Sequence, residues 1–216
     1  MVQVKIRPAQ NKDIPFLGWV MFTAARSHLA ESPWGVIFHE PEARTRILLE
    51  RMSQIPALPW SHVSRFRIAE VGGAPVAAMC GFVPVVEGSP ILAELELGVA
   101  KQEFNYSAER LAGVLDRLTV ATLGFPEDLP DIWGIENVAV LPKFRGKGIL
   151  DRLFMHVLEE GRKKGFKRVQ TLCLIGNERG QQAFERNGFK VLSQKTNPVF
   201  NELFGTPGAK LLVQDL

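Results

Sequence analysis

The chain has 216 residues, of which 46% are hydrophobic and 23% are charged. This composition predicts one domain with a packed core and excludes wholesale disorder. The formal net charge of +3 at pH 7 is small, and no long run of Lys and Arg is present, so the charge pattern does not indicate nucleic acid as a partner.

The cysteines and the apolar segments predict a cytoplasmic protein without a membrane partner. Cys80 and Cys173 each lie in an apolar stretch, which favours two buried free thiols over a disulfide. The chain starts without the apolar segment of a signal peptide. The longest early apolar run, residues 14–25, is too short to cross a bilayer.

The first part of the chain predicts strands and helices in mixed order. Alternation of apolar and polar residues indicates strands, and an apolar stripe with helical spacing indicates a helix. The expected elements are a strand over 2–8, a helix that carries Phe16, Leu17, Val20 and Met21 on one face, a helix over 41–54, and strands over 65–71 and 74–83 joined by a Gly-Gly turn.

Residues 86–131 are harder to assign. The stretch "ILAELELGVA", residues 91–100, alternates like a strand. Ser107 can cap a helix with Leu111, Val114, Leu115 and Leu118 on one stripe, and Gly124 can end it. A loop with two prolines follows over 125–131.

The elements after residue 131 are clearer and alternate between strand and helix. This order predicts an α/β fold with at least one parallel pair of strands. The expected elements are a strand over 132–140, an amphipathic helix over 147–164, a strand over 167–175, a helix over 178–187, and strands over 189–194 and 209–215.

A glycine-containing basic turn joins the strand at 132–140 to the following helix. Gly146 and Gly148 permit close approach of an anion to the backbone, and Arg145 and Lys147 add positive charge. The first turn of a helix leaves N–H groups free and carries a positive partial charge. The turn is therefore either a phosphate cradle or a solvated glycine turn. Walker and Rossmann patterns are absent.

Two stretches carry a resemblance to a known family. "NVAVLPKFRGKGIL" resembles motif A of the GNAT superfamily of N-acetyltransferases, and "NERGQQAFERNGF" resembles its motif B. The resemblance covers roughly residues 132–192. It implies a GNAT-like mixed, largely antiparallel central sheet, with a parallel pair splayed at the cofactor site and helices on both faces. It also implies one domain over 1–216 with an insertion at about 86–131.

The same resemblance assigns a site for acetyl-CoA. The turn would hold the diphosphate, the edge of the preceding strand would pair with the pantetheine arm, and the N–H of Val138 would polarise the thioester carbonyl. Asn177 would contact the pantetheine and Phe184 would pack near the sulfur. Leu150 stands where the family prefers Gly or Ala; it either packs inward or narrows the cradle. The implied cofactor-binding residues are Val138, Ala139, Val140, Arg145, Gly146, Lys147, Gly148, Ile149, Leu150, Asn177 and Phe184.

Acetyl transfer to an amine needs a proton acceptor. With a pKa near 10.4, only about one lysine-like amine in two thousand is neutral at pH 7, which adds on the order of 4 to 5 kcal/mol to the barrier. Glu136 is the candidate catalytic base, or it makes a structural hydrogen bond. Glu94 and Glu96, on the predicted strand at 91–100, are alternatives, although such residues more often form a solvated face.

The leaving thiolate lacks the usual acid, because Phe184 occupies the family's tyrosine position. Water, Ser193 or Tyr106 could replace it, and a thiol with a pKa near 8.5 leaves largely unaided. The four histidines, His28, His39, His62 and His156, have no metal-binding spacing, so no metal is expected.

The sequence therefore predicts an acetyl-CoA-dependent N-acetyltransferase. It would act on a primary amine of a small molecule or peptide, by direct attack in a ternary complex. The alternative is a catalytically silent CoA-binding module, suggested by Phe184 and Leu150. Trp34 and Trp60 either line the acceptor pocket or pack in the core. The insertion covers the acceptor site, forms a homodimer interface, or does both.

Overall fold

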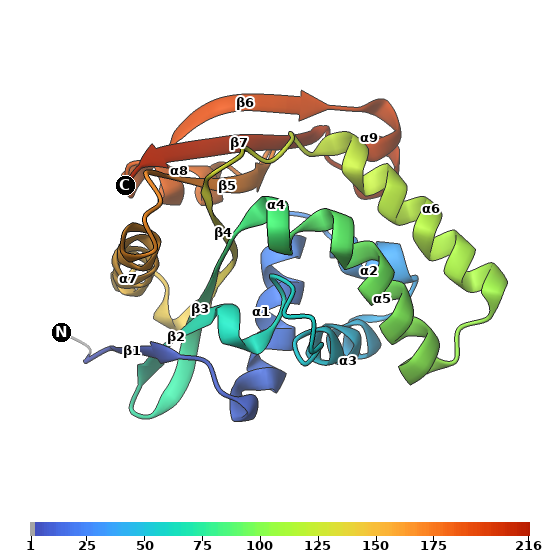
Figure 1. The fold of residues 1–216 in the computed structure, drawn as a ribbon, viewed down its shortest axis with the longest axis horizontal. Helices are drawn as coiled ribbons and strands as arrows, with labels where there is room; N and C mark the ends of the chain where they lie inside the picture. Colours follow the sequence, from blue (N-terminus) through green and yellow to red (C-terminus); the bar gives the residue numbers. More distant parts are fainter. Residues whose placement is uncertain (1–2) are drawn as a thin grey trace.

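The computed structural model describes residues 3–216, apart from the side chains at 89–92; Val2, the first residue of the first predicted strand, lies outside this range. Among the described residues, seven strands form one sheet in the order β1-β2-β3-β4-β5-β7-β6, and only the β4–β5 pair is parallel (Figure 1). The predicted mixed, largely antiparallel sheet is confirmed. The strands are β1 (Lys5–Pro8), β2 (Phe66–Val71), β3 (Ala74–Phe82), β4 (Trp133–Val140), β5 (Arg168–Leu174), β6 (Lys190–Thr196) and β7 (Gly208–Asp215).

Helices cover both faces of the sheet, as predicted, and α1 and α7 lie on opposite sides of its centre (Figure 1). Side chains of a strand alternate between faces, so Cys80 joins the apolar cluster beneath α1 and Met79 joins the cluster beneath α7. Among the described residues the α-helices are α1 (Ile14–Arg26), α2 (Pro33–Phe38), α3 (Glu42–Met52), α4 (Pro84–Glu87), α5 (Ser89–Phe104), α6 (Ala108–Gly124), α7 (Ile149–Lys163), α8 (Glu178–Arg186) and α9 (Pro198–Phe204).

The predicted strand at 91–100 is wrong, because this stretch lies in helix α5. Leu, Glu and Ala are good helix formers, and the helix turns Leu97, Ala100 and Phe104 toward the α1 cluster at helical spacing. The short helices α2, α4 and α9 were also not predicted. Each begins with a proline, which suits the first helical position because no N–H is needed there.

Helix α6 agrees with its prediction at both ends. Ser107 caps it through Oγ, which accepts a hydrogen bond from the Arg110 N–H at 3.3 Å, and the helix ends at Gly124. Val114 is fully buried, whereas Leu115 is 46% exposed and does not face the core. The apolar stripe of α6 is therefore narrower than predicted.

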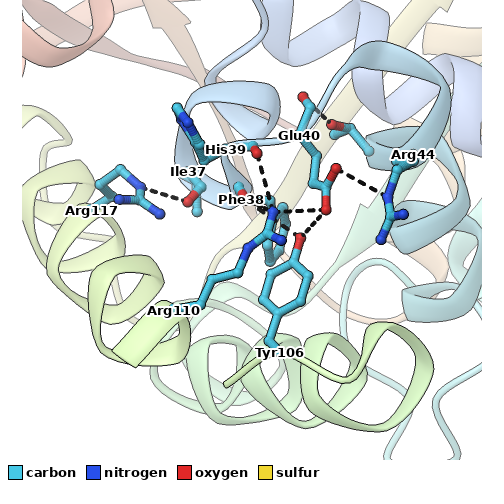
Figure 2. A network of polar contacts seen from close by, with 9 residues as sticks. Ile37, Phe38, His39, Glu40, Arg44, Tyr106, Arg110 and Arg117 are labelled. Atoms are coloured by element: carbon cyan, nitrogen blue, oxygen red, sulfur yellow. Dashed lines mark hydrogen bonds and ion pairs between the residues drawn. The ribbon is translucent and has the colours of Figure 1, made fainter. Parts of the chain in front are cut away.

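A buried acidic side chain attaches the junction of α5 and α6 to the turn between α2 and α3 (Figure 2). The Glu40 carboxylate accepts hydrogen bonds from the Tyr106 hydroxyl and from Arg110, each at 2.8 Å, and it pairs with Arg44 at 3.0 Å. The Arg110 guanidinium lies 3.8 Å from the centre of the Tyr106 ring. Charge-assisted bonds of this kind are stronger than neutral ones, so Glu40 anchors the segment that the sequence marks as an insertion.

Replacing Glu40 by Ala is expected to lower the free energy of unfolding by about 2 kcal/mol, because the Tyr106 hydroxyl and Arg110 would lose their shared acceptor. Urea denaturation measures this change. Glu42→Ala is the matched control, since Glu42 is a half-exposed partner of Arg46 at 4.0 Å and such pairs contribute less than about 1 kcal/mol. Equal losses in both variants would contradict the anchoring role.

Candidate functional site

The site begins where the parallel strands β4 and β5 separate. They pair only from Trp133 opposite Val169 to Ile135 opposite Thr171. Beyond Ile135, β4 stays paired with β3 alone. The facing edges of β4 and β5 are therefore open from Glu136 onward, and the predicted splayed pair is confirmed.

A β-bulge in β4 shapes this opening. Asn137 has a positive φ of 52°, and the pairing with β3 shifts by one residue between Ala78 and Cys80. A bulge places one extra residue on one strand and re-aims its neighbours. As a result, the consecutive residues Glu136, Asn137 and Val138 all line the same cavity. The side-chain nitrogen of Asn137 is a buried donor without a partner among the described residues.

The cavity has a volume of about 820 Å³. Its walls combine the open edges of β4 and β5 with α5, α6 and the loop that follows α6, so the segment 86–131 covers the cavity. Trp34 and Trp60 also line it, and they pack against each other with ring centres 6.4 Å apart, which makes them wall and packing residues at once. The other aromatic wall residues are Phe82, Phe125, Phe184, Phe200 and Phe204.

Glu136 presents a carboxyl group to this cavity. Burial and the neighbouring Asp128 raise its pKa to about 8, because both disfavour the charged form. Asp128 also lines the cavity, and burial raises its pKa. The side chain of Gln170, on β5, fixes the loop that follows α6. Its Nε2 donates a hydrogen bond to Asp128 Oδ1 at 2.5 Å, and its Oε1 accepts one from the Leu129 N–H at 2.9 Å. Two carboxyl groups thus share one side of the site.

The predicted cradle follows β4 as an exposed turn. Gly146 and Gly148 have φ values of 72° and 70°, in the left-handed region that favours glycine. A side-chain carbon added at Gly146 would contact nothing within 4 Å. In the described part of the chain, the amides of residues 146–151 donate to no backbone or side-chain acceptor, and the first helical bond of α7 joins the Arg152 N–H to the Gly148 carbonyl at 3.4 Å. The geometry fits an anion such as a diphosphate.

The flanking side chains leave this turn open. Arg145 and Lys147 are exposed, and Arg145 Nε donates to the Val140 carbonyl at 3.1 Å. Ile149 is buried in the cluster beneath α7. Leu150 is half-buried; it packs on the same cluster and reaches the cavity wall.

Asn177 and Phe184 both line the cavity. The Asn177 side chain caps α8 by accepting a hydrogen bond from the Gly180 N–H at 2.9 Å. Phe184 packs edge-on against Phe154 and Phe189, with both ring-centre distances at 5.7 Å. Local packing therefore positions both residues beside the opening.

Two of the side chains suggested as an acid for the leaving thiolate, Tyr106 and Ser193, do not line the cavity. Tyr106 is buried in the Glu40 cluster and does not line the cavity; burial and Glu40 also raise its pKa far above the usual range. Ser193 is exposed on β6 and is likewise outside the lining.

The two glutamates of α5 differ in their exposure to solvent. Glu94 is exposed, as expected for a solvated face, whereas Glu96 is buried and lines the cavity. The sequence did not single out Asp128 or Lys195, which also line it.

Cys80 and Cys173 are free and buried, as predicted. Among residues 3–216, no group of three or more His, Cys, Asp or Glu side chains could hold a metal ion. In the same residues, none of the helices combines the length and the apolar character that crossing a membrane requires.

Comparisons with known proteins identify the family of this chain. The profile of the Acetyltransferase (GNAT) family matches residues 31–189, more than half of the chain. The chain therefore belongs to the GNAT acetyltransferase family, as the two motifs indicated. A comparison with curated protein sequences gives no match.

Solved structures share the fold across most of the chain. One acetyltransferase has a TM-score of 0.68 at 17% identity, with 98% of each chain covered. An N-acetyltransferase from Staphylococcus aureus Mu50 has a TM-score of 0.64 at 19% identity, covering 97% of this chain and 99% of that one. N-acetylglutamate synthase from Neisseria gonorrhoeae, complexed with coenzyme A and N-acetyl-glutamate, has a TM-score of 0.50 at 18% identity, covering 100% of this chain and 36% of that one.

Proposed function

We propose that this protein is an acetyl-CoA-dependent N-acetyltransferase that acts on a primary amine of a small molecule or peptide in a ternary complex. The observation that carries the proposal is the opening between β4 and β5. It joins a turn of free amides to a cavity that contains a carboxyl group of raised pKa. A cofactor at the turn and an acceptor in the cavity would meet at the splayed strands.

The chain's own backbone would hold coenzyme A. The free amides of residues 146–150 would bind the diphosphate with Arg145 and Lys147 beside it, and the open edge of Val138, Ala139 and Val140 would pair with the amide-bearing arm. Acetyl-CoA supplies an acyl group activated as a thioester. The related synthase from Neisseria gonorrhoeae is complexed with coenzyme A, which supports a shared cofactor.

Within the cavity, Glu136 would accept the proton of the acceptor amine, directly or through water. The Val138 N–H would stabilise negative charge on the thioester oxygen. Asn177 would contact the pantetheine arm of coenzyme A, and Phe184 would pack near its sulfur. A thiol with a pKa near 8.5 leaves without a strong acid, so the absence of a tyrosine hydroxyl at position 184 slows the reaction without preventing it.

A silent CoA-binding module is the second candidate. The observation that favours it is Phe184, whose ring lies among Phe154 and Phe189 and offers no proton. The two candidates share a cofactor site and differ only in turnover.

Thiol release from acetyl-CoA in the presence of a panel of primary amines tests the proposal. We expect amine-dependent release together with acetylated amine detected by mass spectrometry. Binding of coenzyme A without release by any amine would favour the silent module, and no binding of coenzyme A would refute both.

A further inference from the structure

A buried carboxyl group in the cavity has no use in the mechanism above. Glu96 of α5 is only 1% exposed, and neither of its oxygens has a hydrogen-bond partner among the described residues. Burying an unpaired carboxyl group destabilises the fold, and most buried polar groups are hydrogen-bonded. Because Glu96 also lines the cavity, a ligand in the cavity is the natural source of its missing partner.

The remaining lining favours a cationic ligand. Apart from the Cys173 thiol, its ionisable side chains are four carboxyl groups, from Glu96, Glu127, Asp128 and Glu136, and one ammonium group, from Lys195. The Lys195 ammonium already donates to the Thr122 carbonyl at 3.3 Å. The walls also carry indole and phenyl rings, which attract cations through their faces. An anionic acceptor would meet four carboxyl groups and a single ammonium group among the described lining residues.

Glu96 is separate from the carboxyl pair at the splayed strands. Asp128 contributes to the raised pKa of Glu136, whereas burial alone raises that of Glu96. Glu96 lies on α5 and Glu136 lies on β4, so the cavity receives carboxyl groups from two different elements of the fold.

We propose that the acceptor is a diamine-like molecule, with its reacting amine at Glu136 and a second ammonium group bound by Glu96 across an apolar spacer. This inference rests on the proposed function and names the acceptor class of the same cavity. Glu96 is a specificity residue in this assignment, because it contacts the acceptor away from the reacting atoms. An ionised carboxylate accepts charge-assisted bonds from an ammonium group, and a buried pair of this kind binds more strongly than an exposed one.

Calorimetric binding tests the assignment without relying on turnover. The probes are the α,ω-alkanediamines from propanediamine to octanediamine, each compared with the n-alkylamine of equal length, in the presence of coenzyme A. We expect the best diamine to bind the unaltered protein at least about tenfold more tightly than its monoamine, which equals about 1.4 kcal/mol. Glu96→Gln should reduce this preference to less than about threefold while the monoamine affinity stays the same.

Glu94→Gln is the matched control, because Glu94 is exposed on the same helix and its loss should preserve the preference. Glu96→Leu is the second variant; both Glu96 variants should unfold at the same or a higher temperature than the parent, since they remove a buried unpaired acid. Equal binding of diamine and monoamine to the parent, or an intact preference in Glu96→Gln, would overturn the assignment. Selective diamine binding without acetyl transfer would support the assignment while refuting the proposed function.

Discussion

Glu136→Gln is expected to lower kcat by about a hundredfold or more, since a positioned general base typically contributes that much. Gln keeps the size and a hydrogen-bonding oxygen of the side chain but cannot accept a proton at neutral pH. The affinity for coenzyme A should not change, because the predicted cradle is at residues 146–150. Steady-state kinetics with the best amine and calorimetry with coenzyme A measure the two quantities.

The pH dependence provides a sharper test of the same residue. The pKa of Glu136 is raised to about 8, so the carboxylate that can act as a base accumulates only as the pH approaches and passes 8. With an arylamine that stays neutral over the pH range of the assay, kcat/KM should rise with pH to a plateau above about 8. Glu136→Gln should give a flat profile. An unchanged rate and an unchanged profile would show that Glu136 is structural.

Stability should move in the opposite direction to activity. The folded pKa of about 8 exceeds the ordinary glutamate value of 4.5, so the folded protein binds this proton more tightly than the unfolded chain does. The resulting stabilisation is present below pH 4.5 and is lost as the pH rises through about 8. Relative to the parent, Glu136→Gln should therefore gain stability over this range, by about 1 to 2 kcal/mol after allowance for solvent in the cavity.

Gly146→Val is expected to weaken coenzyme A binding by about a hundredfold or more. A β-branched residue is strained at a φ of 72°, so the turn would change conformation and its amides would no longer converge on one anion. Because an added side-chain carbon meets nothing within 4 Å, the loss cannot come from packing in the core. Calorimetric titration with coenzyme A measures the dissociation constant.

Gly73→Val separates backbone strain from loss of the cradle. Gly73 lies in the turn between β2 and β3 with a φ of 81°, and it too has nothing within 4 Å of an added carbon. Both variants should be destabilised by a similar amount, about 1 to 2 kcal/mol. Only Gly146→Val should lose affinity for coenzyme A; equal affinities in the two variants would contradict the diphosphate assignment.

The turn and strand edge to which we assign the cofactor were predictable because their signal is local. The strand, the glycine turn and the amphipathic helix are continuous in sequence, and their order alone places free amides beside a strand edge. Asn177 and Phe184 followed from the second motif. The structure adds contacts that the motifs do not encode, such as the Asn177 cap of α8 and the rings that surround Phe184.

The cavity that we propose for the acceptor could not be predicted because packing assembles it from distant segments. Glu96, Asp128 and Lys195 share a cavity although about a hundred positions separate the first from the last. The error at 91–100 has a simple geometric cause. Residues two apart share one face of a strand but are about 200° apart around a helix, so Glu94 and Glu96 lie on different sides of α5.

The bulge at Asn137 also limits which insertions and deletions β4 can accept. Side chains alternate with a period of two along β4, and the extra residue brings Glu136, Asn137 and Val138 to the same cavity. Deleting or inserting one residue between Trp133 and Asn137 would rotate Glu136 to the opposite face, into the apolar cluster. We therefore expect homologous enzymes with this chemistry to keep the length of the segment constant even where its residues differ.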